Sequence, residues 1–173
     1  SGGAINLTTG GLAGSGTVTA IGGNSVADVY DGGAGGGGRS AVSYTTGTSS
    51  GLTFSAYGGS GTGWGESGAA GTIYKQWGPS NTTELSVINN NQGDVEVSTS
   101  VTVVSNLDKL IASNRGIIDF STTTPVTVDV LDMSVNGDIR VASGTTLTYT
   151  DLVFVSGGRL TERGIINFPS SFT

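Results

Sequence analysis

The sequence contains no cysteine and no histidine, and these two absences exclude several kinds of chemistry. Without cysteine there is neither a disulfide framework nor a thiol nucleophile. Without histidine, neither a Ser-His-Asp triad nor a histidine-based zinc site can form. Only 12% of the residues are charged, and Lys75 and Lys109 are the two lysines. No catalytic motif is present, so we expect no catalytic residue, no metal and no cofactor.

Proline, positive charge and long apolar runs are also scarce. With 3 prolines and glycines that do not fall at every third position, the chain is not collagen-like. A net charge of −6 makes nucleic acid a poor partner. No apolar run approaches the length of a membrane span, so we expect no membrane insertion. The chain begins at Ser1 without a basic and apolar leader, so we expect a mature product or an excised piece.

Glycine is the most abundant feature, with 31 of 173 residues. Each glycine inside a helix costs about 1 kcal/mol relative to alanine, so the composition disfavours helices. Short alternating runs of Val, Ile and Leu have the period of half-buried strands and argue against disorder. Residues 1–78 hold 24 of the glycines, and the composition changes at the turn-like residues 77–81. We therefore distinguish residues 1–78 from residues 79–173, within what could be one continuous all-β domain.

The glycine-rich part contains an internal repeat. Residues 3–10 align with residues 40–47, and residues 17–23 align with residues 53–59. A third copy begins at Gly71. Each unit is predicted to form a strand, a turn, a second strand and then a glycine-rich excursion.

The second part has its own repeat. The motif Arg-Gly-Ile-Ile-Asp-Phe at residues 115–120 recurs as Arg-Gly-Ile-Ile-Asn-Phe at residues 163–168, and residues 136–141 form an intermediate copy. The pair Leu107-Asp108 similarly anticipates Leu131-Asp132, one predicted coil later. These spacings predict coils of about 22–24 residues with equivalent apolar positions inside or over the edge of the stack. The positions expected there are Ile117, Ile118, Phe120, Ile139, Val141, Ile165 and Phe168.

Short strands that return in register favour a right-handed parallel β-helix, or β-solenoid. In such a coil, Val, Ile and Leu stack in the interior, and Thr, Ser and Asp face solvent. A β-sandwich or jelly roll also has short strands and remains the alternative, but it gives no reason for a motif to recur.

The glycine-rich stretches at residues 35–44, 52–59 and 68–74 resemble the glycine-rich repeats of very large secreted or cell-surface bacterial proteins. The resemblance implies the fold of those repeats, a right-handed parallel β-helix. It covers about residues 1–75 and implies a segment of an adhesin-like, stalk or matrix protein. It transfers no catalytic residue.

Paired carboxylates are the main candidates for hydrolytic chemistry. Asp94 and Glu96 would share one face of a strand, and Asp129 and Asp132 flank a predicted corner. Glycosidases need two carboxyl groups about 5–10 Å apart, a spacing that these pairs permit. The simpler interpretation is that these acids keep the outer surface soluble.

The glycine runs near Asp31 and at residues 58–63 are similar to calcium-binding β-roll repeats, which need acidic oxygen ligands. The second run lacks the acid and Asp31 precedes its glycines, so this motif does not predict calcium binding.

Aromatic side chains gather in the glycine-rich part and suggest a surface for sugar. An exposed ring can stack on a pyranose, and the candidate carbohydrate-binding residues are Trp64, Trp77 and Tyr57. The aromatic rings could equally cover the apolar interior or the bare glycine backbone. The cluster comprises Tyr30, Tyr44, Tyr57, Trp64, Tyr74 and Trp77.

Together these features predict a noncatalytic structural or adhesive segment, located outside the cell or at its surface. The alternatives are a carbohydrate-active β-helix, such as a tailspike-like depolymerase, and a dedicated sugar-binding module. Expected partners are further copies joined through terminal coils or strands, adjacent domains of a larger chain, and a polysaccharide.

Overall fold

The computed structural model describes residues 1–26, 32–92, 97–102, 106–155 and 157–169, and these residues form strands and no helix. The all-β prediction is confirmed. The strands are β1 (Ala4–Leu12), β2 (Gly16–Thr19), β3 (Arg39–Gly47), β4 (Leu52–Ser55), β5 (Thr72–Trp77), β6 (Thr82–Ile88), β7 (Thr99–Val101), β8 (Leu107–Ser113), β9 (Ile117–Phe120), β10 (Val126–Met133), β11 (Asp138–Val141), β12 (Thr146–Phe154), β13 (Arg159–Glu162) and β14 (Ile165–Asn167).

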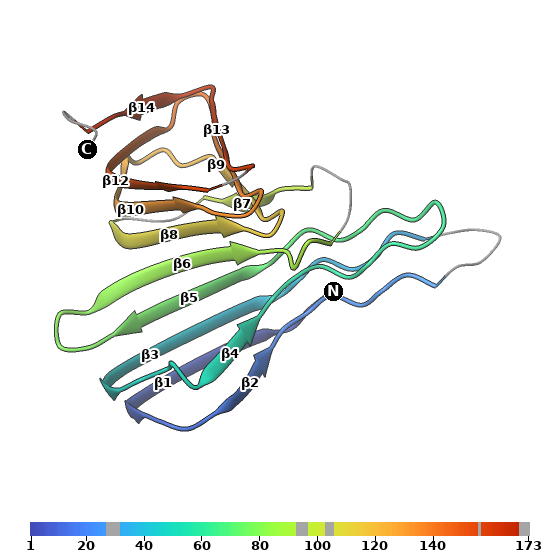
Figure 1. The fold of residues 1–173 in the computed structure, drawn as a ribbon, viewed down its shortest axis with the longest axis horizontal. Helices are drawn as coiled ribbons and strands as arrows, with labels where there is room; N and C mark the ends of the chain where they lie inside the picture. The colour runs from blue at the N-terminus through green and yellow to red at the C-terminus, as the bar shows by residue number, and fades with distance from the viewer. Residues whose placement is uncertain (27–31, 93–96, 103–105, 156, 170–173) are drawn as a thin grey trace.

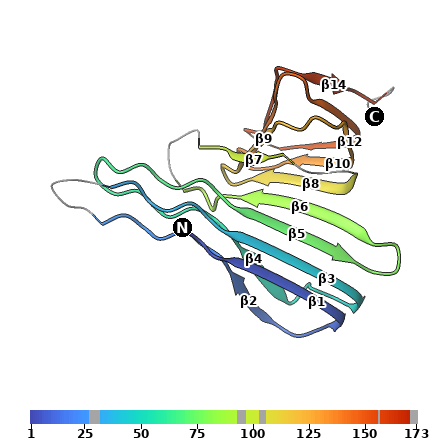
Figure 2. The ribbon, with the colours of Figure 1, turned by 180° about the vertical axis from the view of Figure 1, so that it is seen from behind.

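The strands form three sheets. An eight-stranded sheet has the order β1-β3-β5-β6-β8-β10-β12-β14 and extends from β1 at one side of the molecule to β14 at the other (Figure 1). A four-stranded sheet, β13-β11-β9-β7, accompanies the second part of the chain, and β2 and β4 form a small sheet beside β1 and β3 (Figure 2). All the described strand pairs are parallel except β5 with β6. This arrangement is compatible with a parallel β-helix.

The single antiparallel pair reverses the direction of the chain at the point where the composition changes. A turn joins β5 to β6, in which Gly78 (φ 75°) and Asn81 (φ 53°) adopt the left-handed conformation. The amide of Asn81 donates to the carbonyl of Gly78 at 3.2 Å. Strands β1, β3 and β5 therefore run opposite to the later strands of the same sheet.

In the glycine-rich part, the repeat is present but its register differs from the alignment. Ile5 pairs with Ser40, whereas the alignment places it opposite Val42. The shift is even, so each side chain stays on the face that the alignment gave it. The second strand of the unit pairs as predicted, with Thr17 opposite Thr53, and the third copy begins as β5 at Thr72.

In the second part, the intermediate copy of the predicted repeat is confirmed, but the predicted equivalence of the two Arg-Gly-Ile-Ile copies is wrong. Ile118 of β9 pairs with Ile139 of β11, so the intermediate copy is in register, at a spacing slightly shorter than the predicted coil. The later copy forms β14 in the other sheet, beside β12. The motif recurs because Gly116 and Gly164 both pack against a backbone carbonyl where a Cβ would not fit, and such a corner precedes strands of both sheets.

The same shorter spacing corrects the leucine alignment. Leu110 of β8 lies opposite Leu131 of β10, whereas Leu107 lies opposite Val128.

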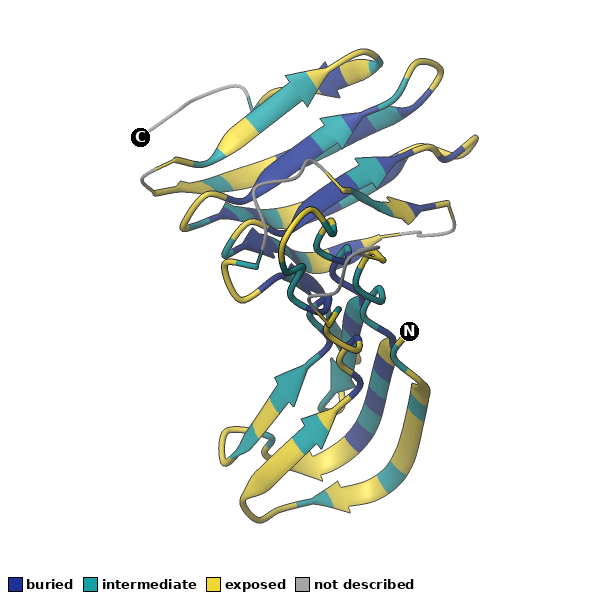
Figure 3. Cartoon of the chain, turned by 90° about the vertical axis from the view of Figure 1, so that its right-hand side faces the viewer, coloured by how far each residue is buried: buried dark blue, intermediate teal, exposed yellow. Residues whose placement is uncertain are grey.

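The apolar core lies in the second part of the chain. β10 buries Val126 and Val128, exposes Asp129, and then buries Leu131 and Met133, so the strand changes the face that it buries midway. Together with the four-stranded sheet, the bent strands surround a core that Figure 3 shows as dark blue segments concentrated in one half of the molecule.

The predicted interior positions are only partly inside. Ile117, Ile118, Phe120, Ile139 and Val141 are buried, whereas Ile165 and Phe168 are each 58% exposed. In β14 it is the neighbouring residue Ile166 that is buried.

The two parts bury opposite faces of the shared sheet. Tyr74 pairs with Leu85 and packs on the core of the second part. Ile73 pairs with Ser86 and is buried on the other face, as is its parallel neighbour Ser40. Because neighbouring residues of a strand point to opposite faces, β6 is covered on both sides.

The glycine-rich segments pack against one another without regular strands. We call residues 20–25, 32–38, 56–61 and 65–71 the glycine bundle. The backbone amides of Ala34 and Gly37 donate to the carbonyls of Glu66 and Ala69, respectively, in one neighbouring segment. The amides of Gly35 and Gly38 donate to the carbonyls of Gly23 and Ala20, respectively, in another. A segment whose backbone hydrogen-bonds to each neighbour at every third residue has the periodicity of a polyproline II helix, which is extended and has three residues per turn.

Candidate functional site

Trp64 is the most exposed aromatic residue of the described chain, with a relative exposure of 95%. It lies in a tight turn that the amide of Gly65 closes by donating to the carbonyl of Thr62 at 2.9 Å. Gly63, directly before it, has a φ of 62°, which a residue with a side chain rarely adopts. The local sequence Thr-Gly-Trp-Gly therefore places the indole at the tip of a turn.

Neighbouring segments hold this turn in place. The amide of Thr62 donates to Ser25 Oγ at 2.8 Å, and the two hydroxyls lie 3.1 Å apart. The amide of Gly61 donates to Ser67 Oγ at 2.9 Å. Gly65 packs so closely on the carbonyl of Gly32 that a side chain would not fit there. The exposed indole is thus carried by a firmly anchored backbone.

A polar groove of about 760 Å³ lies beside Trp64. Its charged and amide side chains are Glu66 from the glycine bundle and Asn91, Gln92 and Arg115 from the second part of the chain. Ser60 and Ser67 add hydroxyl groups. The groove therefore combines an aromatic ring with hydrogen-bond donors and acceptors, the combination that binds polyhydroxylated ligands.

Asn91 and Arg115 reach the groove from stacked corners of left-handed backbone, which we call the corner ladder. Asn91 (φ 57°) and Arg115 (φ 64°) are each preceded by a left-handed asparagine, and the amide of Asn91 donates to the carbonyl of Asn114 at 2.9 Å. Val135 and Asn136 form the next corner, one coil further along the chain.

The structure does not bring the three predicted carbohydrate-binding residues together. Tyr57 is half-buried in the glycine bundle, where its carbonyl accepts the amide of Gly22 at 2.9 Å. Trp77 is the last residue of β5, half-buried and paired with Tyr44 and Thr82. Neither lines the groove that contains Trp64.

Sequence reasoning missed Glu66, Asn91, Gln92 and Arg115. The asparagine-rich corners were the available indication, because asparagine tolerates left-handed backbone and such corners recur along the chain.

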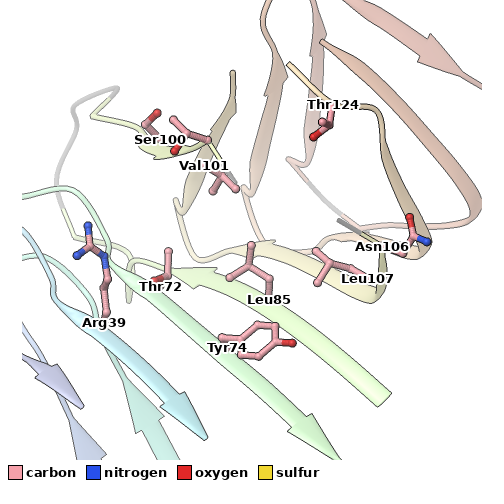
Figure 4. A pocket seen from close by; sticks show the side chains of 10 residues that line it. Arg39, Thr72, Tyr74, Leu85, Ser100, Val101, Asn106, Leu107 and Thr124 are labelled. Atoms are coloured by element: carbon pink, nitrogen blue, oxygen red, sulfur yellow. The ribbon is translucent and has the colours of Figure 1, made fainter. Parts of the chain in front are cut away.

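A second hollow, of about 640 Å³, lies at the open end of the core. Strand β7 is the end strand of the four-stranded sheet, so no described strand of that sheet covers β5. Figure 4 shows Tyr74 and Leu85 on the neighbouring strands β5 and β6, with Val101 of β7 above them. The cleft therefore has an apolar floor, and Arg39 lies at its edge.

Among the residues that the structure describes, neither hollow contains a pair of carboxylates. Among the described lining residues, the cleft at the end of the core has no acidic side chain and the groove has only Glu66. Asp132 pairs with Lys109 at 3.0 Å, and Asp129 is exposed on the same strand. Asp94 and Glu96, like Tyr30 and Asp31, lie outside the described residues. In the described ranges, no three acidic side chains cluster as metal ligands.

The remaining charged contacts stabilise strands. The hydroxyl and the amide of Thr83 both donate to Asp108 Oδ2 at 2.7 Å. These two hydrogen bonds, above all the one from the hydroxyl, hold the pKa of Asp108 below its usual value. The carboxylate of the buried Asp138 accepts hydrogen bonds at Oδ2 from Arg140 Nε at 2.8 Å and from Arg159 Nη2 at 2.6 Å. Burial raises the pKa of Tyr149.

Comparison of the chain with protein families, curated proteins and solved structures finds no match. Within the described part of the chain, no helix has the length and hydrophobicity needed to cross a bilayer.

Proposed function

We propose that the chain is a noncatalytic structural and adhesive segment of an extracellular right-handed β-solenoid, which associates through the open edges of its main sheet. The observation that carries the proposal is the eight-stranded sheet itself, which ends on β1 at one side and β14 at the other. An uncovered edge strand presents backbone donors and acceptors that template further pairing.

β1 is well suited to strand addition. It is 9 residues long, most of its residues are exposed, and its one sheet neighbour among the described strands is β3. The carbonyl of Gly3 accepts the amide of Arg39, so it faces β3. Because backbone groups alternate along a strand, the amides of Asn6 and Thr8 point to the open edge.

The predominance of parallel pairs supports a solenoid over a jelly roll, whose neighbouring strands are antiparallel. Repeated strand addition at opposite edges does not close on itself, so it gives a filament rather than a dimer.

Sedimentation velocity at several protein concentrations tests the proposal. We expect the wild-type sedimentation coefficient to rise with concentration. Thr8→Pro removes an edge donor without breaking the ladder to β3, so this variant should remain monomeric. Thr8→Val keeps the donor and should associate like wild type, and circular dichroism checks that both variants are folded. A wild-type chain that stays monomeric at all concentrations would contradict the assembly.

A further inference from the structure

We propose that the groove beside Trp64 binds a neutral polysaccharide, with a pyranose ring stacked on the indole. The inference supplies a ligand class for the adhesive role and rests on the proposed function for its extracellular setting. The binding geometry itself depends only on the groove and not on self-association.

Trp64 is exposed at the tip of an anchored turn. A side chain that is 95% exposed contributes almost nothing to the core. Its turn is nevertheless anchored by the bonds from Thr62 to Ser25 and from Gly61 to Ser67. Such anchoring lowers the conformational entropy lost when a ligand binds. A held, exposed indole offers a flat apolar surface to the C–H face of a sugar ring.

Polar and charged side chains line the groove around the indole. The Glu66 carboxylate accepts hydrogen bonds, the Arg115 guanidinium donates them, and the amides of Asn91 and Gln92 do both. Sugar hydroxyls are donors and acceptors at once, so this mixture can satisfy several of them. Asn91 and Arg115 stand on adjacent steps of the corner ladder, which fixes the direction in which their side chains leave the backbone.

The charge of the groove and that of the whole chain indicate whether the ligand is neutral or charged. Within the groove one acid, Glu66, offsets one base, Arg115, so no net positive charge attracts a polyanion. The chain as a whole carries a charge of −6, which repels acidic polysaccharides such as alginate or polygalacturonate. The observations therefore favour a neutral chain of pyranoses.

Tryptophan fluorescence provides a direct test. The variant Trp77→Phe leaves Trp64 as the sole tryptophan, and it is prepared together with Thr8→Pro so that binding is measured on a monomer. Neutral glucan, mannan, galactan and xylan oligosaccharides are titrated against this protein, with alginate and polygalacturonate oligomers as the charged set. We expect at least one neutral oligosaccharide to shift the Trp64 emission in a saturable way.

Substitutions in the groove identify the contacts, with affinity measured by calorimetry. Trp64→Ala should weaken binding at least tenfold, Trp64→Phe less, and Glu66→Gln several-fold, whereas Trp77→Phe should bind like wild type. The inference is overturned by the absence of binding to every neutral oligosaccharide, by binding to the charged set alone, or by an unchanged affinity in Trp64→Ala. Saccharide binding without self-association of the wild type would uphold the groove and contradict only the assembly.

Discussion

Gly36 and Gly37 are adjacent in the glycine bundle, but their surroundings differ. A Cβ on Gly37 would overlap the carbonyl oxygen of Ala56, whereas a Cβ on Gly36 would meet nothing nearer than the Ala69 carbonyl oxygen at 3.8 Å. Neither residue has a left-handed φ. At Gly37, glycine is therefore required by close packing rather than by backbone conformation.

This contrast predicts unequal effects of the same substitution. Gly37→Ala should lower the free energy of unfolding by about 3 kcal/mol, because the added Cβ would displace backbone atoms of Ala56 and Gly71 in the neighbouring segments. Gly36→Ala should leave it unchanged or raise it slightly, since alanine restricts the unfolded chain. Urea denaturation of the two variants measures the difference. Equal destabilisation would show that the close packing of residue 37 is not what holds the bundle together.

The sequence alone could not separate these two glycines. It predicted the glycine-rich excursions and the start of β5 at Gly71–Thr72, because glycine content and alternation are local properties. It could not predict which glycines touch a neighbouring segment, since that depends on the register between segments far apart in the chain. The same limit explains why the alignment placed Ile5 opposite Val42 when its partner is Ser40.

At the scale of elements, the corner ladder places left-handed residues after β6, β8 and β10. Asn90, Asn91, Asn114 and Asn136 occupy left-handed positions that asparagine tolerates, but Val135 has a φ of 49° in the same ladder. A β-branched residue in this region is strained by its own Cβ substituents. Val135 is also 45% exposed, so its side chain gains little from packing.

Replacing this valine should therefore stabilise the protein. Val135→Asn is expected to raise the free energy of unfolding by about 1 kcal/mol, because asparagine adopts the left-handed conformation at lower cost. Val153 is a suitable control, being 37% exposed but within β12. Val153→Asn should be neutral or destabilising, since asparagine is disfavoured in strands. Thermal and urea denaturation measure both variants, and a destabilised Val135→Asn would refute the argument from strain.

The elements also show where repeat analysis succeeds and fails. The copy at residues 136–141 was found correctly because Ile118 and Ile139 occupy the same position of successive coils. The copy at residues 163–168 has the better sequence match but lies in another sheet. A glycine followed by two isoleucines describes a tight corner that leads into a strand, and more than one corner of a coil needs that combination.

The candidate site was predictable only in part for a related reason. Trp64 was predicted as one of the aromatic residues that gather in the glycine-rich part, and such clustering is visible in the sequence. Asn91 and Arg115 come from the other part of the chain and reach the groove through the fold. The prediction that Trp64 and Trp77 belong to one site was wrong. Trp77 lies at the end of β5, next to the turn into β6, and pairs with Tyr44 of β3.

At the scale of the whole molecule, two unlike parts share one sheet. The apolar core cluster begins at Ala70 and lies almost wholly in the second part, whereas the first part combines glycine packing and backbone hydrogen bonds with a few buried side chains such as Val42 and Ile73. The link between them is β6, together with Asn89, whose side chain accepts the amide of Gly58 at 3.0 Å. In a stacked architecture each layer contacts mainly its neighbours, so stability is expected to be a sum of local contributions.

This organisation predicts that damage to the core stays local. Leu131 is fully buried in the middle of β10, and Leu131→Ala should cost about 3 kcal/mol through lost burial and a cavity. Native-state hydrogen exchange should show the loss in the amides of β8, β10 and β12, while β1 and β3, at the far side of the sheet, keep wild-type protection. An equal fall in protection along the whole sheet would instead mean that β6 couples the two parts into one cooperative unit, and that the glycine-rich part owes its stability to the core.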